Sequence, residues 1–235
     1  MTTTDDPAWL RALAHEVRLF DRSSTAERVA DVLRSRITEG ELPPGSRLSE
    51  EQLVSVLSVS RNTLREAFRL LTHEGLLVHQ MHRGVFVPEL AADDLVDLYR
   101  LRCMIECDVV RSLEGNLDMA RLRPLHDDVA AGESAAQRGD WVAVGTANMR
   151  FHQHLVELAG SRRMNEVTAR LLAELRLAFH AVASAQRLHE PYVNRNRGLL
   201  GLLVTGEVER AAKELEEYLH DSRAELLDAV RSRQP

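Results

Sequence analysis

One short segment of the 235-residue chain combines residue types that suit contact with DNA: Ser60-Arg61-Asn62-Thr63-Leu64-Arg65. On a helix, Arg61 and Arg65 lie one turn apart on the same face, and both side chains are long enough to reach guanine edges in the major groove. The side chains of Ser60, Asn62 and Thr63 can contact bases or phosphates, and the backbone amides that begin a helix favour a phosphate. Because the solvated face of any amphipathic helix looks similar, the interpretation depends on the elements around the segment.

Those elements are predicted to be three helices and a β-wing. Capping residues and apolar residues at helical spacing predict helices that begin near residues 25, 49 and 61 and end before Gly40, Ser58 and Gly75. The positions expected to be buried in the second and third helices are Leu53, Val56, Leu57, Leu64, Ala67, Phe68 and Leu71. Two β-like runs, residues 76–78 and 85–87, follow and enclose a polar loop. This order is that of a winged helix-turn-helix, whose recognition helix would be 61–74.

The rest of the chain has helical periodicity. Predicted helices span residues 94–113, 117–137, 141–158, 162–187, 192–205 and 207–231, with breaks at Gly115, Gly139, Gly160, Pro191 and Gly206. The predicted fold class is therefore mainly α, a winged helix-turn-helix followed by an all-helical antiparallel bundle. The predicted domains are a DNA-binding domain at 23–88 and a helical effector-binding and dimerisation domain at 93–232. Residues 1–22 form an extension whose short amphipathic pattern fits either a docked helix or a weakly ordered arm.

Composition sets further bounds. Hydrophobic residues make up 44% and charged residues 28% of the chain, which is typical of a globular protein. The net charge is −6, while residues 22–88 carry +1, so only a local surface is expected to contact DNA. Cys103 and Cys107 lie on one helix face, where a disulfide would be strained, so a core packing role is favoured over metal binding or redox sensing. Without an 18-residue apolar run or a signal pattern, we expect a cytoplasmic protein that does not bind membranes.

Four N-terminal segments resemble, as a set, the GntR family of regulators: LPPGSRLSE at 42–50, VSRNTLREA at 59–67, EGLL at 74–77 and RGVFV at 83–87. The resemblance implies a homodimer that binds palindromic double-stranded operator DNA. It also implies that the wing tip enters the minor groove. The residues implicated in operator contact are Ser60, Arg61, Asn62, Thr63, Arg65, Arg83 and Gly84. Glu51 departs from the family pattern, because many relatives place a DNA-contacting Arg there.

The C-terminal half resembles the FCD ligand-binding domain of the FadR-type subfamily, in LRxxIE at 101–106, FHxxL at 151–155 and the segment 202–218. Many such domains hold a divalent metal through one Asp and three His. The matching residues here are Asn148, His152, Asn196 and Tyr218. Only His152 is retained, and amide and phenol oxygens are poor ligands for zinc-type metals. We therefore expect no metal cofactor and a polar cavity that hydrogen-bonds a small organic effector.

Arg102 is placed to pair with a carboxylate of that effector, which suggests an organic acid. One alternative is a divalent metal held by His152 together with His180 or His220, and another is that Asn148 and Asn196 are simply satisfied buried amides. A helical metal-dependent enzyme would need a ligand set and a general base, and neither a HExxH motif nor a nucleophile elbow occurs. A winged helix that binds protein is a further rival. The favoured function is a ligand-responsive, sequence-specific DNA-binding regulator, expected to be a repressor and not an enzyme.

Overall fold

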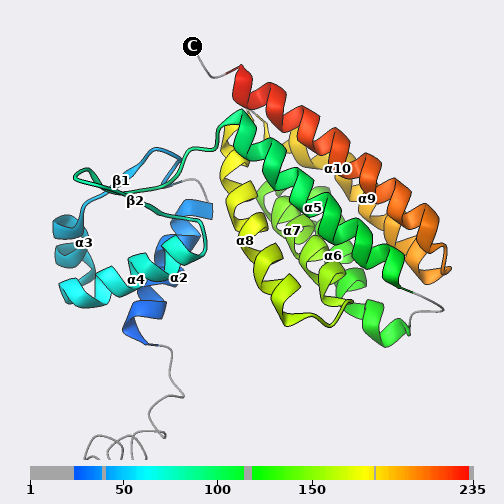
Figure 1. Ribbon diagram of the computed structural model, residues 1–235, viewed down its shortest axis with the longest axis horizontal. Helices are drawn as coiled ribbons and strands as arrows, with labels where there is room; N and C mark the ends of the chain where they lie inside the picture. Colours follow the sequence, from blue (N-terminus) through cyan, green and yellow to red (C-terminus); the bar gives the residue numbers. More distant parts are fainter. Residues whose placement is uncertain (1–23, 39–40, 114–117, 183, 233–235) are drawn as a thin grey trace, which may run out of the picture.

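The computed structural model describes residues 24–38, 41–113, 118–182 and 184–232. A small winged-helix domain lies beside a larger helical bundle (Figure 1). The predicted fold class, mainly α with a winged helix-turn-helix and an all-helical second half, is confirmed. The predicted N-terminal extension, residues 1–22, lies outside the described residues. Within the described residues, no helix is both long and apolar enough to span a bilayer.

Three helices and a three-stranded sheet make up the winged-helix domain: α2 (Thr25–Thr38), β1 (Arg47–Leu48), α3 (Glu50–Leu57), α4 (Arg61–His73), β2 (Val78–Gln80) and β3 (Gly84–Phe86). The helix starts follow from capping. Ser24 Oγ accepts a hydrogen bond from the Glu27 amide, and the Glu27 carboxylate accepts one from the Ser24 amide. The inner face predicted for the recognition helix is confirmed, because Leu64, Ala67, Phe68 and Leu71 are all buried.

Three details of this domain differ from the sequence prediction. The two-residue strand β1 pairs with β3 in the order β1-β3-β2, and it is too short to show an alternating pattern. Strand β2 begins at Val78 and not at residue 76, because the amides of Leu76 and Leu77 bond to the Leu71 carbonyl and close the end of α4. Val56 was expected to be buried but is 79% exposed, since the short helix α3 directs that face to solvent.

The bundle consists of α5 (Ala92–Ser112), α6 (Met119–Gln137), α7 (Trp141–Glu157), α8 (Arg162–Ala178), α9 (Ala185–Val204) and α10 (Val208–Arg231). The breaks predicted at Gly139, Gly160 and Gly206 are confirmed, and all three glycines have a positive φ. After the first two of these turns, Asp140 and Ser161 cap the next helix. The predicted break at Gly115 lies outside the described residues.

The predicted break at Pro191 is wrong. Helix α8 ends at Ala178, a 3₁₀ turn η2 (Phe179–Ala181) follows, and α9 begins at Ala185. Ser184 caps α9 by accepting a hydrogen bond from the Arg187 amide at 3.3 Å, and the helix continues through the exposed Pro191. A proline in this position loses one backbone hydrogen bond but does not end the helix, because the surrounding packing holds it.

This shift changes which residues share a face. His189, Tyr192 and Asn196 are now spaced three and four residues apart on one helix, and all three are buried. Because α9 begins before Pro191, their side chains point together into the bundle interior.

Helix α8 is the bundle helix next to the winged-helix domain (Figure 1). Leu177, near the end of α8, is 2% exposed and belongs to the winged-helix core, where it packs with residues such as Ile37 and Leu71. His180 Nε2 lies 3.2 Å from the Ile37 carbonyl oxygen at the end of α2. The two domains therefore meet through α8 and η2.

Candidate functional site

The first candidate site is the start of α4. Ser60 is the N-cap, and its Oγ accepts a hydrogen bond from the Thr63 amide at 3.0 Å and lies 2.8 Å from Thr63 Oγ1. These two hydroxyls are thus engaged in the cap. Arg61 and Asn62 follow in the first turn with exposed side chains. The helix start therefore presents a cation, an amide and its first backbone amides to solvent, which suits contact with a DNA backbone and base edges.

Arg65 has a partner that the sequence did not reveal. Its Nε lies 3.2 Å from both carboxylate oxygens of Glu50, in the first turn of α3, and its Nη2 lies 3.1 Å from Glu50 Oε2. The hydrogen bond and the charge of Glu50 raise the pKa of Arg65. Glu50 therefore holds this guanidinium in one orientation on the exposed face of α4.

The wing places a second basic region beside the sheet. The Arg83 amide closes a turn on the Gln80 carbonyl at 3.0 Å, and the Arg83 guanidinium lies 5.5 Å from the Phe86 ring centre. Gly84 has a φ of +105°, which only glycine adopts easily. A Cβ atom at Gly84 would lie 3.6 Å from Arg47 Nε. Arg47 therefore adds a cation next to the wing, and its position there was not predicted from the sequence.

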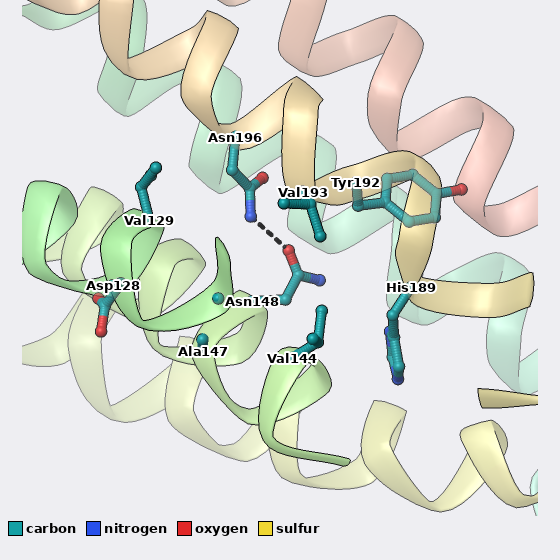
Figure 2. A pocket seen from close by; sticks show the side chains of 10 residues that line it. Asp128, Val129, Val144, Ala147, Asn148, His189, Tyr192, Val193 and Asn196 are labelled. Carbon is teal, nitrogen blue, oxygen red and sulfur yellow. Dashed lines mark hydrogen bonds between the residues drawn. The ribbon is translucent and has the colours of Figure 1, made fainter. Parts of the chain in front are cut away.

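The second candidate site lies inside the bundle. Three residues predicted to share a site meet there: the Asn196 amide donates a hydrogen bond to Asn148 Oδ1 at 2.7 Å, and the Tyr218 hydroxyl donates another to the same oxygen at 2.7 Å. Figure 2 shows the contact between Asn196 of α9 and Asn148 of α7. Burial raises the pKa of Tyr218 well above its ordinary value, so its phenol is neutral.

Behind this group lies a buried charged triad. The Arg102 guanidinium donates from Nε to Glu106 Oε1 at 2.7 Å, and His152 Nδ1 lies 2.7 Å from Glu106 Oε2. All three side chains are at most 2% exposed. Burial opposes the charged form of Glu106, yet the charge of Arg102 and the hydrogen bonds to His152 and Arg102 lower its pKa. Glu106 belongs to the LRxxIE motif, but its pairing with His152 could not be predicted from that motif.

The protonation of His152 follows from this contact. Burial lowers the pKa of His152, and an ionised carboxylate can only accept, so the ring carries its proton on Nδ1 and donates it to Glu106. Its Nε2 is therefore an acceptor. Within the described residues, three buried polar atoms of this region have no hydrogen-bond partner: Arg102 Nη2, His152 Nε2 and Asn196 Oδ1.

Two small hollows flank Asn148, His189 and Tyr192, which line both of them. The first also reaches Asp128 and Asn196, and Figure 2 shows its lining. The second is lined by Arg102 and by all three tyrosines of the chain, Tyr99, Tyr192 and Tyr218. Each hollow has a volume of about 10 Å³, which is enough for about one water molecule. His152 lines neither hollow.

The residues at this site do not fit the divalent metal that the resemblance implies. Asn148 Oδ1 already accepts two hydrogen bonds, and Tyr218 is a neutral phenol. The histidines of the alternative site are remote from His152: His180 contacts the Ile37 carbonyl, and the side chain of His220 is 67% exposed. Among the described residues, no group of three or more His, Cys, Asp or Glu is placed to hold a metal ion.

Cys103 and Cys107 pack against the bundle core. Their sulfur atoms are 3.7 Å apart, and Cys107 is 1% exposed. Burial raises the pKa of the Cys107 thiol, so this thiol is poorly reactive.

Comparison with known proteins supports both halves of this arrangement. Residues 25–87 match the model of the gntR family of bacterial regulatory proteins, and residues 97–221 match the FCD domain. Over 136 residues, 57% of this chain, the protein is 30% identical to the uncharacterized HTH-type transcriptional regulator YdhC of Bacillus subtilis, and the aligned stretch spans 61% of that relative. It is 27% identical to a probable D-xylose utilization operon transcriptional repressor of Paenarthrobacter nicotinovorans, over 84% of this chain and 87% of the relative.

The fold also has a close counterpart among solved structures. A putative GntR transcriptional regulator from Rhodococcus sp. RHA1 superposes with a TM-score of 0.81 at 37% identity. The comparison covers 88% of this chain and 99% of that one.

Proposed function

The chain belongs to the gntR family of bacterial regulatory proteins and carries an FCD domain, and from this premise we propose that it is a ligand-responsive repressor. Its relatives are transcriptional regulators and not enzymes. The winged-helix domain is proposed to bind the operator, and the bundle to bind a small organic effector that changes operator affinity. Repression is supported by the name of the Paenarthrobacter relative.

The observation that carries operator binding is the exposed start of α4. Arg61 and Asn62 face solvent in its first turn, and Arg65 lies one turn further on the exposed side. Arg83 and Gly84 on the wing are proposed to contact the adjacent minor groove. Ser60 and Thr63 are proposed to contribute by capping the start of α4, whose backbone amides can bind a phosphate.

A homodimer on a palindromic operator is proposed together with this function. One winged helix buries a small DNA surface, whereas two on a common frame read two half-sites. The family resemblance supports this assembly.

Operator binding is tested by fluorescence anisotropy with the DNA upstream of the protein's own gene. Arg61→Ala is expected to weaken specific binding about 10- to 100-fold, because a good base contact contributes about 1–3 kcal/mol. The matched control is Arg123→Ala on α6, whose side chain is 81% exposed and distant from α4 in the chain. Failure of the unaltered protein to form a specific complex even at low salt would overturn the proposal.

The observation that carries effector binding is the set of unpartnered polar atoms. Arg102 Nη2 is a buried cationic donor and lines the second hollow, and Asn196 Oδ1 is a buried acceptor and lines the first. Leaving such groups without partners costs free energy that a ligand can recover. An organic acid with a hydroxyl or N–H donor satisfies both, with its carboxylate on Arg102 and its donor on Asn196. Asn148, His152 and Tyr218 are proposed to complete the site.

Effector binding is tested by thermal shift with a panel of hydroxy acids, plain carboxylic acids and their neutral amides. A hydroxy acid is expected to raise the melting temperature of the unaltered protein and to have no effect on Asn196→Leu. If no compound in the panel binds, the organic-acid assignment fails while operator binding is untouched.

A further inference from the structure

We propose that His189 is the residue that senses occupation of the cavity: the effector displaces its imidazole, and the displacement passes through Phe179 and η2 to the winged-helix domain. The inference rests on the proposed ligand-responsive function and adds the route by which it acts. It starts from the size of the two hollows. Because each holds about one water, an organic effector fits only if the wall between them moves.

Three side chains form that wall, Asn148, His189 and Tyr192. Asn148 is held by two hydrogen bonds at 2.7 Å. Tyr192 donates to Glu225 at 3.4 Å and packs against the Tyr218 ring at 4.6 Å. The imidazole of His189 makes no hydrogen bond within the part of the chain that the structure describes, and only burial and the charge of Arg176 act on its pKa. It is therefore the member of the wall that costs least to displace.

A glycine on α7 creates the seat of His189. A Cβ atom at Gly145 would lie 2.5 Å from His189 Nε2, closer than real side chains approach, and 3.0 Å from its Cε1. The imidazole thus rests directly on the backbone of α7, and it is 5% exposed. Figure 2 shows the ring descending from α9 beside Val144 of α7. Because glycine alone leaves room for it, any side chain at position 145 forces the ring out of its place.

On its other side, His189 contacts the turn that joins the two domains. Its ring meets the Phe179 ring edge to face, with centres 5.0 Å apart. Phe179 begins η2, and the next residue, His180, contacts the Ile37 carbonyl at the end of α2. Two residues before Phe179, Leu177 is buried in the winged-helix core. A displaced His189 therefore pushes on a turn that is anchored in the winged-helix domain on both sides of Phe179.

The winged-helix domain transmits this push to the recognition helix. Ile37 is fully buried and shares one core cluster with Leu64 and Phe68 of α4. Because such a core is close-packed, a displacement of the end of α2 also displaces the helices packed against it. The expected consequence is a change in the placement of α4 and a weaker fit to the operator.

The test uses substitutions that imitate the effector, so it needs no identified ligand. Operator affinity is measured by fluorescence anisotropy for Gly145→Ala in the full-length protein. We expect about a tenfold loss of affinity, within the usual range of coupling between two sites. The matched control is Gly132→Ala, which adds the same methyl group to another buried helical glycine, on α6, where the new Cβ would lie 3.5 Å from Ala147 Cβ, an ordinary contact. Its affinity is expected to equal that of the unaltered protein.

Two double variants distinguish the relay from simple damage. The first combines Gly145→Ala with His189→Ala, which removes the ring that the new methyl group would displace. The second combines Gly145→Ala with Phe179→Ala, which removes the ring that the displaced His189 would contact. Both are expected to return to within about twofold of the operator affinity of the matching single variant, His189→Ala or Phe179→Ala. If Gly145→Ala does not fold, His189→Trp adds volume on the same side without altering α7, and its loss of affinity should also disappear with Phe179→Ala.

The outcomes separate this inference from the proposed function. If Gly145→Ala binds the operator as tightly as Gly132→Ala, or if its loss persists without Phe179, the relay is wrong and operator binding stands. If the unaltered protein and Gly132→Ala both fail to bind the operator, the proposed function itself fails.

Discussion

At the scale of single residues, the FCD site shows how replacing carboxylate and imidazole groups by amide and phenol groups changes what the site can bind. Asn148, Asn196 and Tyr218 occupy the positions at which the resemblance implies metal ligands, and they form a hydrogen-bonded group around one amide oxygen. An amide and a phenol that satisfy one another leave little affinity for a metal ion, whereas a carboxylate and imidazoles at the same positions would have a metal's preferred donors.

This difference gives a prediction about metal content. The purified protein, without a histidine tag, is expected to contain no stoichiometric transition metal by elemental mass spectrometry. The triple variant Asn148→Asp, Asn196→His, Tyr218→His, which adds a carboxylate and two imidazoles around His152, is expected to bind about one zinc or nickel ion per chain. A stoichiometric metal in the unaltered protein would instead mean that His180 or His220 moves to complete a site.

The pKa of His189 gives a prediction about acid stability. Burial and then the charge of Arg176 lower this pKa to about 4, so the folded protein keeps the ring neutral where the unfolded chain takes up a proton. The contribution of His189 to stability is therefore complete above the histidine pKa of the unfolded chain, about 6.5. It is lost as the pH falls toward 4. Between pH 7 and pH 5 the expected loss from His189 is about 2 kcal/mol.

Urea unfolding at the two pH values checks this loss. His189→Gln, which cannot take up a proton, should show a smaller fall in the free energy of unfolding. The pKa of His152 is also lowered, and its contribution is common to both proteins. An equal fall in the two proteins would contradict the assignment to His189.

At the scale of elements, α8 belongs to two cores at once. Leu172 and Leu175 pack in the bundle core, and Leu177 packs in the winged-helix core. A helix shared in this way makes the stability of the DNA-binding domain depend on a residue of the bundle.

Leu177→Ala tests this dependence. Removing a fully buried leucine side chain is expected to destabilise its surroundings by about 2–4 kcal/mol. Hydrogen exchange followed by mass spectrometry should show faster exchange in α2 and α4 than in α5 and α10. Leu227→Ala in α10, which is buried in the bundle core, is the matched control and should give the opposite pattern. The same exchange pattern for both variants would show that the two cores unfold as one unit.

At the scale of the whole molecule, charge is distributed unevenly. The chain carries −6, while residues 22–88 carry +1, so the bundle is acidic and the DNA-binding half is nearly neutral. The acidic bundle opposes unspecific attachment to DNA, and attraction to phosphates depends on the few cations of α4 and the wing.

Salt dependence measures those cations directly. The logarithm of operator affinity is expected to fall linearly with the logarithm of salt concentration, and Arg83→Ala should reduce the slope by about 1 if Arg83 contacts a phosphate. Arg138→Ala at the end of α6 is a control that should leave the slope unchanged. An unchanged slope for Arg83→Ala would remove the wing from the proposed DNA contacts.

The sequence by itself determined the elements and their class. Caps such as Ser60, positive-φ glycines such as Gly139 and the 3.6-residue spacing of apolar side chains are local signals, so the winged helix and most bundle helices could be predicted from them. Only the tertiary structure decided where α9 begins, because packing overrode the proline at 191. It also decided the contacts between distant residues: the Glu50–Arg65 pair, the buried contact of His152 with Glu106, and the position of His189 against Gly145. Such contacts join different helices or depend on burial, and no periodicity along the chain encodes them.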